Sequence, residues 1–234
     1  MFLVTGGTGF IGKRVVAQLL SKNIQVIATD INTDNEKDSF EKYLSTKGVS
    51  IKDLELLELD ISSKENLSKI FKNYKISNII ACGYQMSNLI DNNPIKGAEV
   101  NIVGMTNLFQ AVVDNKIHRM VFPSSQSVYG KSSKLFKDKP IHEDDYCGLQ
   151  HQLFTYAVMK LLNEFMAKKY VSMHHVSIAC TRPSVVFGYG RKRSSLMWAE
   201  EFATNPALEM PVHLPFPESN KDNYIYVEDC AEQF

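Results

Sequence analysis

Two side chains with complementary acid–base chemistry lie four residues apart, in Tyr156-Ala157-Val158-Met159-Lys160. On a helix this spacing places the phenol and the ammonium on the same face, one turn apart. A tyrosine has a reference pKa of about 10, but a neighbouring cation favours the phenolate and can lower that pKa by about 1–3 units. The pair could therefore move a proton to or from a substrate oxygen. Taken alone, however, the spacing favours a packed aromatic residue beside a solvated lysine.

A second group of polar side chains, Ser124-Ser125-Gln126-Ser127, follows the apolar run Met120–Pro123. We expect this run to form a strand, and parallel α/β sheets bind ligands at the carboxyl ends of their strands. Ser125 would then lie at the mouth of a ligand crevice, where its hydroxyl could donate a hydrogen bond to a substrate oxygen. Judged alone, the segment fits a serine-rich turn equally well.

Three glycines, Gly6, Gly9 and Gly12, lie between the apolar run Met1–Val4 and the helical pattern Phe10–Leu20. In a G-x-x-G-x-x-G loop the first glycine permits a tight turn, the second lets backbone approach a pyrophosphate, and the third lets helix and strand pack closely. The helix N-terminus adds free N–H groups and a positive dipole. An ordinary glycine-rich turn is the alternative, but the strand before and the helix after favour a dinucleotide cradle.

Asp30 ends the predicted strand Ile24–Thr29, about 20 residues beyond the glycine loop, where a carboxylate accepts hydrogen bonds from the adenosine ribose. Residues 29–33 contain no Arg or Lys to neutralise a 2′-phosphate, so NAD is favoured over NADP. Asp30 could instead cap a turn into the acidic segment that follows. Asp60 ends the predicted strand Leu54–Leu59 and could reach the adenine amino group, although a simple turn residue fits there as well.

The rest of the first 190 residues alternates between apolar runs and helical patterns. We expect further strands at Ser77–Cys82, Met120–Pro123 and Val176–Thr181, and helices at Lys64–Lys72, Ile95–Asp114 and His151–Tyr170. Continuously apolar strands separated by helices are typical of a parallel sheet buried on both faces. Residues 1–190 therefore predict an α/β domain with a doubly wound parallel sheet, the Rossmann fold. We interpret three polar stretches as loops: Asn32–Lys52, Lys131–Gly148 and Asn205–Lys221.

The C-terminal segment, residues 191–234, shows a weaker pattern and predicts part of a small substrate-binding lobe that returns to the Rossmann core. A helix of about seven residues without a C-cap is an unusual end for a chain, so we expect the lobe to continue beyond Phe234. The expected elements are a helix at Leu196–Thr204, extended segments at Val212–Leu214 and Tyr224–Val227, and a helix starting in Glu228–Phe234.

Composition and charge narrow the range of partners. Lys plus Arg number 26 and Asp plus Glu number 26, so no excess of positive charge attracts nucleic acid or an anionic membrane. No apolar stretch approaches the roughly 18 residues of a membrane span, and the chain begins with a strand, which predicts a cytoplasmic protein. The six histidines show no metal-ligand spacing and no G-x-S-x-G motif is present, so we expect neither a metal site nor a hydrolase.

Eight motifs, taken in chain order, resemble those of the extended short-chain dehydrogenase/reductase family, in its NAD-dependent epimerase/dehydratase group. The glycine loop resembles T-G-x-x-G-x-x-G, Ser124–Gly130 resembles S-S-x-x-V-Y-G, and Tyr156 with Lys160 matches the Y-x-x-x-K pair. The other five are Asp60-Ile61, Cys82-Gly83, Asn101–Gly104, Arg182–Gly188 and Tyr224–Asp229. No single motif is decisive, but their common order along the whole chain is specific.

The resemblance implies a role for each matching residue. Tyr156 would be the acid/base acting on a substrate hydroxyl or carbonyl, Lys160 its pKa-lowering partner and ribose anchor, and Ser125 the ligand of the substrate oxygen, while NAD exchanges hydride. Cys82 and Tyr84 depart from the residues usual in the family. The expected cofactor-binding residues are Gly6, Gly9, Phe10, Ile11, Gly12, Asp30, Ile31, Asp60, Ile61, Cys82, Gly83, Tyr84, Asn101, Tyr156, Lys160 and Pro183.

The predicted function is NAD-dependent hydride transfer on a sugar or nucleotide sugar, with an epimerase favoured. Gln126 and Ser127 occupy the positions of the acidic pair that family dehydratases use, which argues against a dehydratase. The alternatives are a NAD-dependent dehydrogenase or carbonyl reductase of a small or sugar-acid substrate, and a non-catalytic NAD-sensing regulator. The resemblance also implies a homodimer that pairs Ile95–Asp114 and His151–Tyr170, and it places the basic run Arg191–Arg193 near anionic substrate groups.

Overall fold

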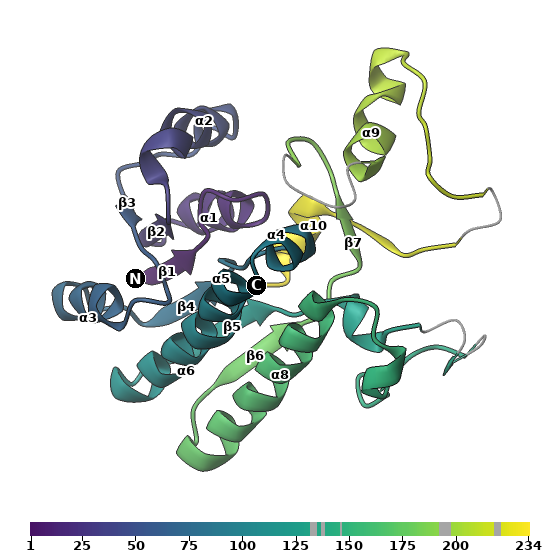
Figure 1. The fold of residues 1–234 in the computed structure, drawn as a ribbon. Helices are drawn as coiled ribbons and strands as arrows, with labels where there is room; N and C mark the ends of the chain where they lie inside the picture. The colour runs from purple at the N-terminus through teal and green to yellow at the C-terminus, as the bar shows by residue number, and fades with distance from the viewer. Residues whose placement is uncertain (132–134, 137–138, 146, 192–197, 218–220) are drawn as a thin grey trace.

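The central feature of the structure is a six-stranded parallel sheet with the strand order β3-β2-β1-β4-β5-β6 (Figure 1). The structure is a computed structural model that describes residues 1–131, 135–136, 139–145, 147–191, 198–217 and 221–234. The strands are β1 (Phe2–Thr5), β2 (Val26–Asp30), β3 (Leu54–Glu58), β4 (Asn78–Ala81), β5 (Arg119–Pro123) and β6 (Ile178–Thr181). The predicted doubly wound parallel sheet is therefore confirmed.

The direction of winding reverses at the centre of the sheet, between β1 and β4. From β1 the chain moves outward through β2 to β3, then crosses back to β4 and moves outward to β6. Thr5, at the end of β1, pairs with Thr29 on one side and Ala81 on the other. The loops that follow these strands consequently leave the sheet at the same edge. Such a switch point is where open parallel sheets bind their ligands.

Helices cover both faces of the sheet (Figure 1). Leu3 and Val4, adjacent in β1, are fully buried and belong to opposite cores, because successive strand side chains point to opposite faces. This double burial explains why the strand sequences are apolar throughout. One layer contains α1 (Gly12–Ser21), α2 (Thr33–Thr46) and α10 (Val227–Glu232); the other contains α3 (Lys64–Asn73), α6 (Met105–Asp114) and α8 (Thr155–His174).

Helix α2 shows that the interpretation of Asn32–Lys52 as a loop was wrong. Asp34 and Glu36 lie in its first turn, where carboxylates stabilise a helix N-terminus. Its buried apolar side chains are Phe40 and Leu44, which lie one turn apart and pack into the core beneath α1. An apolar stripe this narrow gives little helical periodicity, so the sequence pattern did not reveal the helix.

The predicted helix Ile95–Asp114 is interrupted. The chain forms α4 (Ser87–Asn92) and α5 (Pro94–Ala98), then a π-helical turn η1 (Glu99–Gly104), and only then α6. Gly104 packs against Ile61, so closely that a Cβ there would lie 2.6 Å from the Ile61 Cγ1 atom. Single π-helical turns inside helices occur often at functional sites, and η1 carries Asn101 of the predicted site.

The predicted helix His151–Tyr170 begins and ends later than expected, because α8 starts at Thr155 and continues to His174. A short 3₁₀ turn precedes it. The described 3₁₀ turns are η2 (Gln126–Tyr129), η3 (Leu149–His151) and η4 (Pro206–Leu208). None of the helices in the described ranges is long and apolar enough to cross a membrane.

The C-terminal segment contributes a second, two-stranded parallel sheet made of β7 (Val185–Phe187) and β8 (Tyr224–Tyr226). The sequence predicted an extended segment where β8 lies but did not predict β7, and the segment expected to be extended at Val212–Leu214 forms no regular strand. Helix α9 (Trp198–Thr204) confirms the helix predicted at Leu196–Thr204, whose first two residues lie outside the described ranges.

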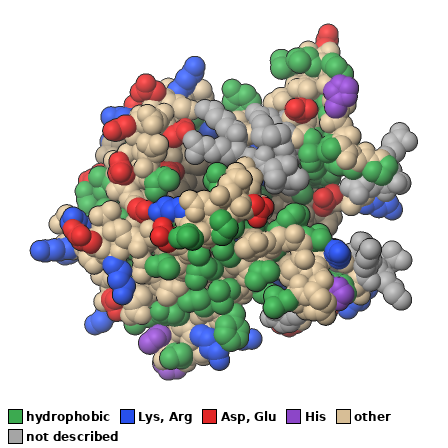
Figure 2. All heavy atoms as spheres, viewed as in Figure 1, with side chains coloured by type: hydrophobic (Ala, Val, Ile, Leu, Met, Phe, Trp, Pro, Cys, Tyr) green, Lys and Arg blue, Asp and Glu red, His purple; other side chains and the backbone are tan. Residues whose placement is uncertain are grey.

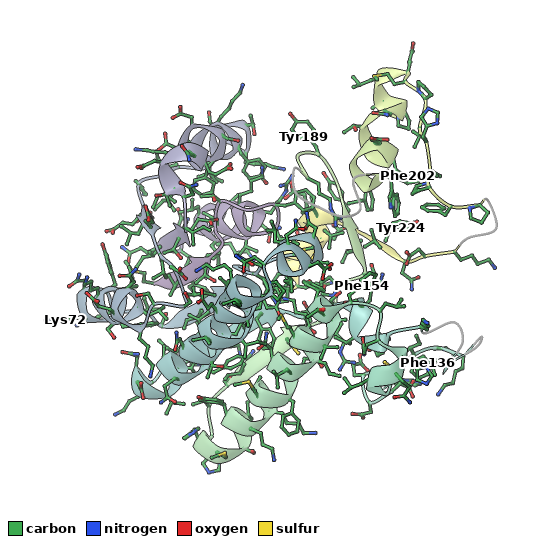
Figure 3. All side chains as sticks on the ribbon, viewed as in Figure 1. Lys72, Phe136, Phe154, Tyr189, Phe202 and Tyr224 are labelled. Carbon is green, nitrogen blue, oxygen red and sulfur yellow. The ribbon has the colours of Figure 1, made fainter. Side chains whose placement is uncertain are left out.

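Helix α9 stands away from the central sheet (Figure 1) and packs against β8 through aromatic side chains. Phe202 and Tyr224 face one another there (Figure 3), with their rings stacked at 6.1 Å between centroids. Because β7 precedes residue 190 and its partner β8 follows it, the two parts of the chain are joined by backbone pairing. The proposed division into residues 1–190 and 191–234 stays a prediction.

Candidate active site

The glycine loop lies at the switch point and has no room for side chains. Gly6 has φ +64°, and a Cβ there would lie 2.6–2.8 Å from the backbone of Cys82 and Gly83, in the loop after β4. A Cβ on Gly12 would overlap the Gly6 carbonyl oxygen. The two loops therefore touch backbone to backbone. Within the described ranges no side chain caps the N-terminus of α1, and the Lys13 and Arg14 N–H groups of its first turn donate to the Gly9 and Ile11 carbonyls at 3.1 and 2.9 Å.

Asp30 is tied directly to the glycine loop. Its Oδ2 accepts a hydrogen bond of 2.6 Å from the Thr8 hydroxyl, and its Oδ1 accepts one of 2.9 Å from the Ile31 N–H. This arrangement fixes a carboxylate at the end of β2, next to the phosphate cradle, where a ribose hydroxyl would be recognised. Thr8 was missed by the sequence reasoning, since only its place inside the loop distinguished it.

Asp60 is engaged by neighbouring side chains of the protein. Its Oδ1 accepts bonds from the Ser62 N–H and hydroxyl, and its Oδ2 pairs with the Lys96 ammonium at 3.2 Å. Partial burial alone would raise the pKa of Asp60, but the Ser62 hydrogen bonds and the Lys96 ammonium together hold it below its ordinary value. The carboxylate is thus held ionised at the end of β3. Its contact with adenine stays a prediction.

The three predicted catalytic residues come together. Tyr156 comes from the first turn of α8, and the Ser125 side chain, which follows β5, lies close enough to the phenol to act on its pKa. Ser125 Oγ accepts bonds of 3.1 and 2.9 Å from the Ser127 N–H and hydroxyl. These bonds fix the Ser125 hydroxyl beside the phenol. Two segments that lie about thirty residues apart therefore meet at the carboxyl edge of the sheet, as expected.

Burial raises the pKa of Tyr156 to about 12, although Ser125 and the charge of Arg191 act in the opposite direction. The sequence led us to expect that Lys160 would supply the lowering charge. Lys160 itself is buried, and burial lowers its pKa to about 7. Its Nζ donates a 2.5 Å hydrogen bond to the Pro123 carbonyl and lies 3.4 Å from the centroid of the Tyr84 ring.

Asn101 anchors the loop after β4. Its side chain accepts a 2.8 Å bond from the Gln85 N–H and donates a 3.0 Å bond to the Gln85 carbonyl. The Asn101 carbonyl, in the π-helical turn, accepts a 2.9 Å bond from the Asn163 amide of α8. The second donor hydrogen of the same amide goes to the Tyr84 hydroxyl at 3.2 Å. Asn101 and the buried Asn163 thus link the β4 loop to the catalytic helix.

Four more of the predicted cofactor residues lie at the same edge, whereas the Ile61 side chain is buried in the hydrophobic core and the Ile31 side chain is exposed. The Gly83 N–H donates to the Thr5 hydroxyl at 3.3 Å, and Cys82 precedes it with a thiol whose pKa burial raises to about 12. The Pro183 carbonyl accepts a 3.0 Å bond from the Gln126 N–H, which fastens the chain after β6 to the Ser125 loop. Phe10 stacks beneath the Arg14 guanidinium, 4.8 Å from its ring centroid.

Arg191 lies against the glycine loop rather than in open solvent. Its side chain is buried, donates to the Val186 carbonyl, and lies 5.9 Å from the Phe10 ring centroid. Together with its effect on Tyr156, this places a cation between the cradle and the acid/base. The predicted contact of the basic run with anionic substrate groups stays a prediction. Of the three residues only Arg191 is described, because Lys192 and Arg193 lie outside the described residues.

A buried ion pair that the sequence reasoning missed braces the site. Arg182 holds Glu164 through two hydrogen bonds of 3.0 and 2.6 Å, and both side chains are about nine-tenths buried. Ser124, next to Ser125, also hydrogen-bonds Glu164. The sequence offered one indication that Glu164 belongs to the site: Tyr156, Lys160 and Glu164 follow one another at four-residue intervals, which places them on one helix face.

A dinucleotide cradle with an acidic residue at the end of β2, joined to a serine, a tyrosine and a lysine at the same sheet edge, defines the nicotinamide-dependent Rossmann enzymes. The model of the NAD dependent epimerase/dehydratase family matches residues 2–234, and the chain belongs to that family.

Among curated relatives, the chain is 26% identical over 234 residues to a putative UDP-glucose 4-epimerase of Methanocaldococcus jannaschii, covering 99% of this chain and 71% of that protein. It is 27% identical over 237 residues to a UDP-glucuronate 4-epimerase of Thermodesulfobacterium geofontis, with 98% and 69% covered. An uncharacterized 37.6 kDa protein of Escherichia coli O111:H- is 26% identical, with 99% and 67% covered. The chain thus spans about two thirds of the length of these relatives.

Two solved structures share the fold. The UDP-glucose 4-epimerase of Thermus thermophilus, solved with NAD, has a TM-score of 0.74 at 23% identity, covering 99% of this chain and 72% of that one. An L-threonine dehydrogenase of Clostridium difficile has a TM-score of 0.78 at 20% identity, covering 99% and 68%. The same fold therefore carries both epimerases and dehydrogenases.

Replacing Glu164 by alanine should lower the free energy of unfolding by about 3–5 kcal/mol, because the Arg182 guanidinium would stay buried without its carboxylate. Urea unfolding followed by circular dichroism measures this change. Glu65→Ala is the matched control, since Glu65 forms an exposed pair with Lys69 at 2.7 Å and its loss should leave the midpoint unchanged. Equal midpoints for the two variants would contradict the bracing role.

Proposed function

We propose that this chain carries the NAD-dependent centre of an epimerase that interconverts a hydroxyl and a carbonyl on a nucleotide sugar. The observation that carries the proposal is the juxtaposition of Ser125, Tyr156 and Lys160: Ser125 is close enough to act on the pKa of Tyr156, and the Lys160 Nζ lies 5.5 Å from the centroid of the Tyr156 ring. The epimerase names printed for relatives that align along the whole chain support the substrate class.

The residues of the cradle fit a dinucleotide. At Gly6 and Gly12 any Cβ would overlap neighbouring backbone, so only glycine fits there. Asp30 presents a carboxylate, fixed by Thr8, where the ribose would lie. The N-terminus of α1 would hold the pyrophosphate. Asp30 would favour NAD, since residues 29–33 bring no cation for a 2′-phosphate. When bound, NAD supplies the acceptor and donor of the hydride.

The protein's own groups would handle the proton. Ser125 would orient the substrate oxygen toward Tyr156, whose phenolate oxygen would take the carbinol proton in the oxidation and whose hydroxyl would return it in the reduction. A buried phenol with a pKa of about 12 is a reluctant base, so cations around it must favour its ionised form. Arg191 acts in this direction on Tyr156, and Lys160, whose Nζ lies 5.5 Å from the centroid of the Tyr156 ring, would be the second cation.

A NAD-dependent dehydrogenase or carbonyl reductase is the second candidate, and the high TM-score with an L-threonine dehydrogenase favours it. The two differ in the fate of the hydride. An epimerase returns it to the same carbon, whereas a dehydrogenase releases NADH. A non-catalytic NAD sensor is least favoured, because Ser125, Tyr156 and Lys160 are all present. A cytoplasmic location stays a prediction of the sequence.

Tyr156→Phe should abolish turnover and leave NAD affinity nearly unchanged, because only the proton-transferring hydroxyl is removed. Purified protein would be screened against UDP-sugars by NMR for epimer formation, with absorbance at 340 nm recorded in parallel. Tyr170→Phe is the control on the same helix, since that hydroxyl contacts Gln110 instead. Retained epimer formation in Tyr156→Phe would refute the assignment, and steady NADH release by the unaltered protein would favour the dehydrogenase.

Homodimerisation is part of the proposal. Hydrophobic side chains gather on one face of the molecule (Figure 2). Four of them are 41–75% exposed: Ile95 in α5, Val103 in η1, and Leu162 and Phe165 in α8. Exposed apolar side chains on α8 and on the helical segment that leads into α6 suit pairing with a second copy into a four-helix interface.

Light scattering on the unaltered chain should therefore give the mass of a dimer at micromolar concentration. Phe165→Glu should shift the mass toward the monomer, since a charge would be buried in the interface. Lys42→Glu, a charge change on the opposite helix layer, should leave the dimer intact. A monomeric mass for the unaltered protein would overturn this part of the proposal.

A further inference from the structure

The Tyr84 ring forms a lid over the ammonium of Lys160. The Lys160 Nζ lies 3.4 Å from the centroid of that ring, well inside the range of about 6 Å for a cation–π contact. Pro123 accepts a 2.5 Å hydrogen bond from the same Nζ. The ammonium is therefore held between a carbonyl dipole and an aromatic face.

The ring is itself held at two points. Its hydroxyl accepts the 3.2 Å bond from Asn163, and its edge meets the Tyr156 ring at 5.6 Å between centroids and an angle of 89°. This is the edge-to-face geometry that aromatic pairs prefer. Tyr84 cannot turn away from Lys160 without losing both contacts. Both contacts come from α8, so this helix fixes the orientation of the Tyr84 ring.

The other titratable groups around the buried Lys160 amine do little to stabilise its charged form. The Glu164 carboxylate is one turn away on α8, but both of its oxygens are bound by Arg182. Two neighbouring thiols stay protonated near neutral pH: burial raises the pKa of Cys82, just after β4, to about 12, and desolvation together with the Glu164 charge raises the pKa of the more exposed Cys180 of β6 to about 11. The groups that bear on Lys160 are Tyr84 and Cys82 from the β4 side, Cys180 from β6, and Tyr156 and Glu164 from α8.

We propose that Tyr84 is a positioning residue of the hydride-transfer centre, whose ring face keeps the Lys160 amine charged and aimed at the Pro123 carbonyl beside Tyr156. The consequence for turnover rests on the proposed function, whereas the contact between ring and ammonium does not. Burial destabilises the charged form of the Lys160 amine. An aromatic face stabilises that form, and it does so more strongly when the contact is desolvated than when it is exposed to solvent.

The sign of the effect follows from which form the ring stabilises. A quadrupole facing the amine favours the protonated form, so removing the ring should lower the pKa of Lys160 further below about 7. A shift of about one pH unit is expected for a desolvated contact of this kind. Lys160 would then lose its charge at a lower pH, and a step that needs the ammonium would fail there.

The test compares Tyr84→Leu, which removes the ring, with Tyr84→Phe, which keeps the ring and removes only the hydroxyl bonded by Asn163. The measured quantity is the pH titration of the Lys160 Cε resonance in cofactor-free protein labelled with ¹³C-lysine, identified by its absence in Lys160→Met. We expect Tyr84→Leu to titrate about one pH unit lower than the unaltered protein, and Tyr84→Phe to titrate close to it. Tyr84→Met replaces Tyr84→Leu if the latter does not fold.

Equal titration midpoints in the unaltered protein and the variant without a ring would overturn the proposal. So would an equal shift in Tyr84→Phe, which would assign the effect to the hydroxyl. Where the protein turns over a nucleotide sugar, the alkaline limb of kcat/KM should move down with the resonance, a change that mere destabilisation would not produce. If the resonance shifts but no substrate is turned over, the proposed function fails and the contact stands.

Discussion

The reversal of strand order between β1 and β4 is the constraint on which the site depends. It sends two loops away from neighbouring strands at one edge of the sheet, where Gly6 lies against the backbone of Gly83. A Cβ on Gly6 would overlap the Cys82–Gly83 backbone, so the two loops meet backbone to backbone at the N-terminal end of α1. The carboxylate at the end of β2 is then fixed beside them by Thr8. Cofactor recognition is a consequence of this topology before any side chain takes part.

The catalytic half of the site is built on burial. Tyr156 and Lys160 are carried by a helix that lies across the sheet, and burial works against the ionised form of both. Polar contacts offset that cost at particular atoms: the Pro123 carbonyl for the amine, Ser125 for the phenol, and the Glu164–Arg182 pair for the loop that carries Ser125. Unpaired groups in such a setting are costly, which makes the network sensitive to the loss of any member.

Periodicity and the glycine spacing were enough to predict the parallel sheet and the glycine loop. The meeting of Ser125 with Tyr156 was predicted from the family resemblance, because the tyrosine–lysine spacing and the serine-rich turn were each ambiguous alone. Helix α2 was not predicted because its buried apolar residues are Phe40 and Leu44, and two such positions give too little helical periodicity to be recognised. The contacts of Tyr84 with Lys160 and of Glu164 with Arg182 join residues from different elements, and no local pattern encodes such a pairing. The π-helical turn at Asn101 likewise has its partner in another element, since Asn163 of α8 donates a hydrogen bond to the Asn101 carbonyl.

The central claim is that hydride leaves a carbinol of the substrate for NAD at the Ser125–Tyr156–Lys160 centre. The most direct measurement uses a nucleotide sugar carrying deuterium at the reacting carbon, incubated with NAD-loaded protein and quenched in acid-free denaturant, followed by mass spectrometry of the cofactor. The account predicts reduced cofactor that carries one deuterium, and an epimeric product that keeps its label. Unlabelled cofactor, with deuterium lost to water, would contradict it.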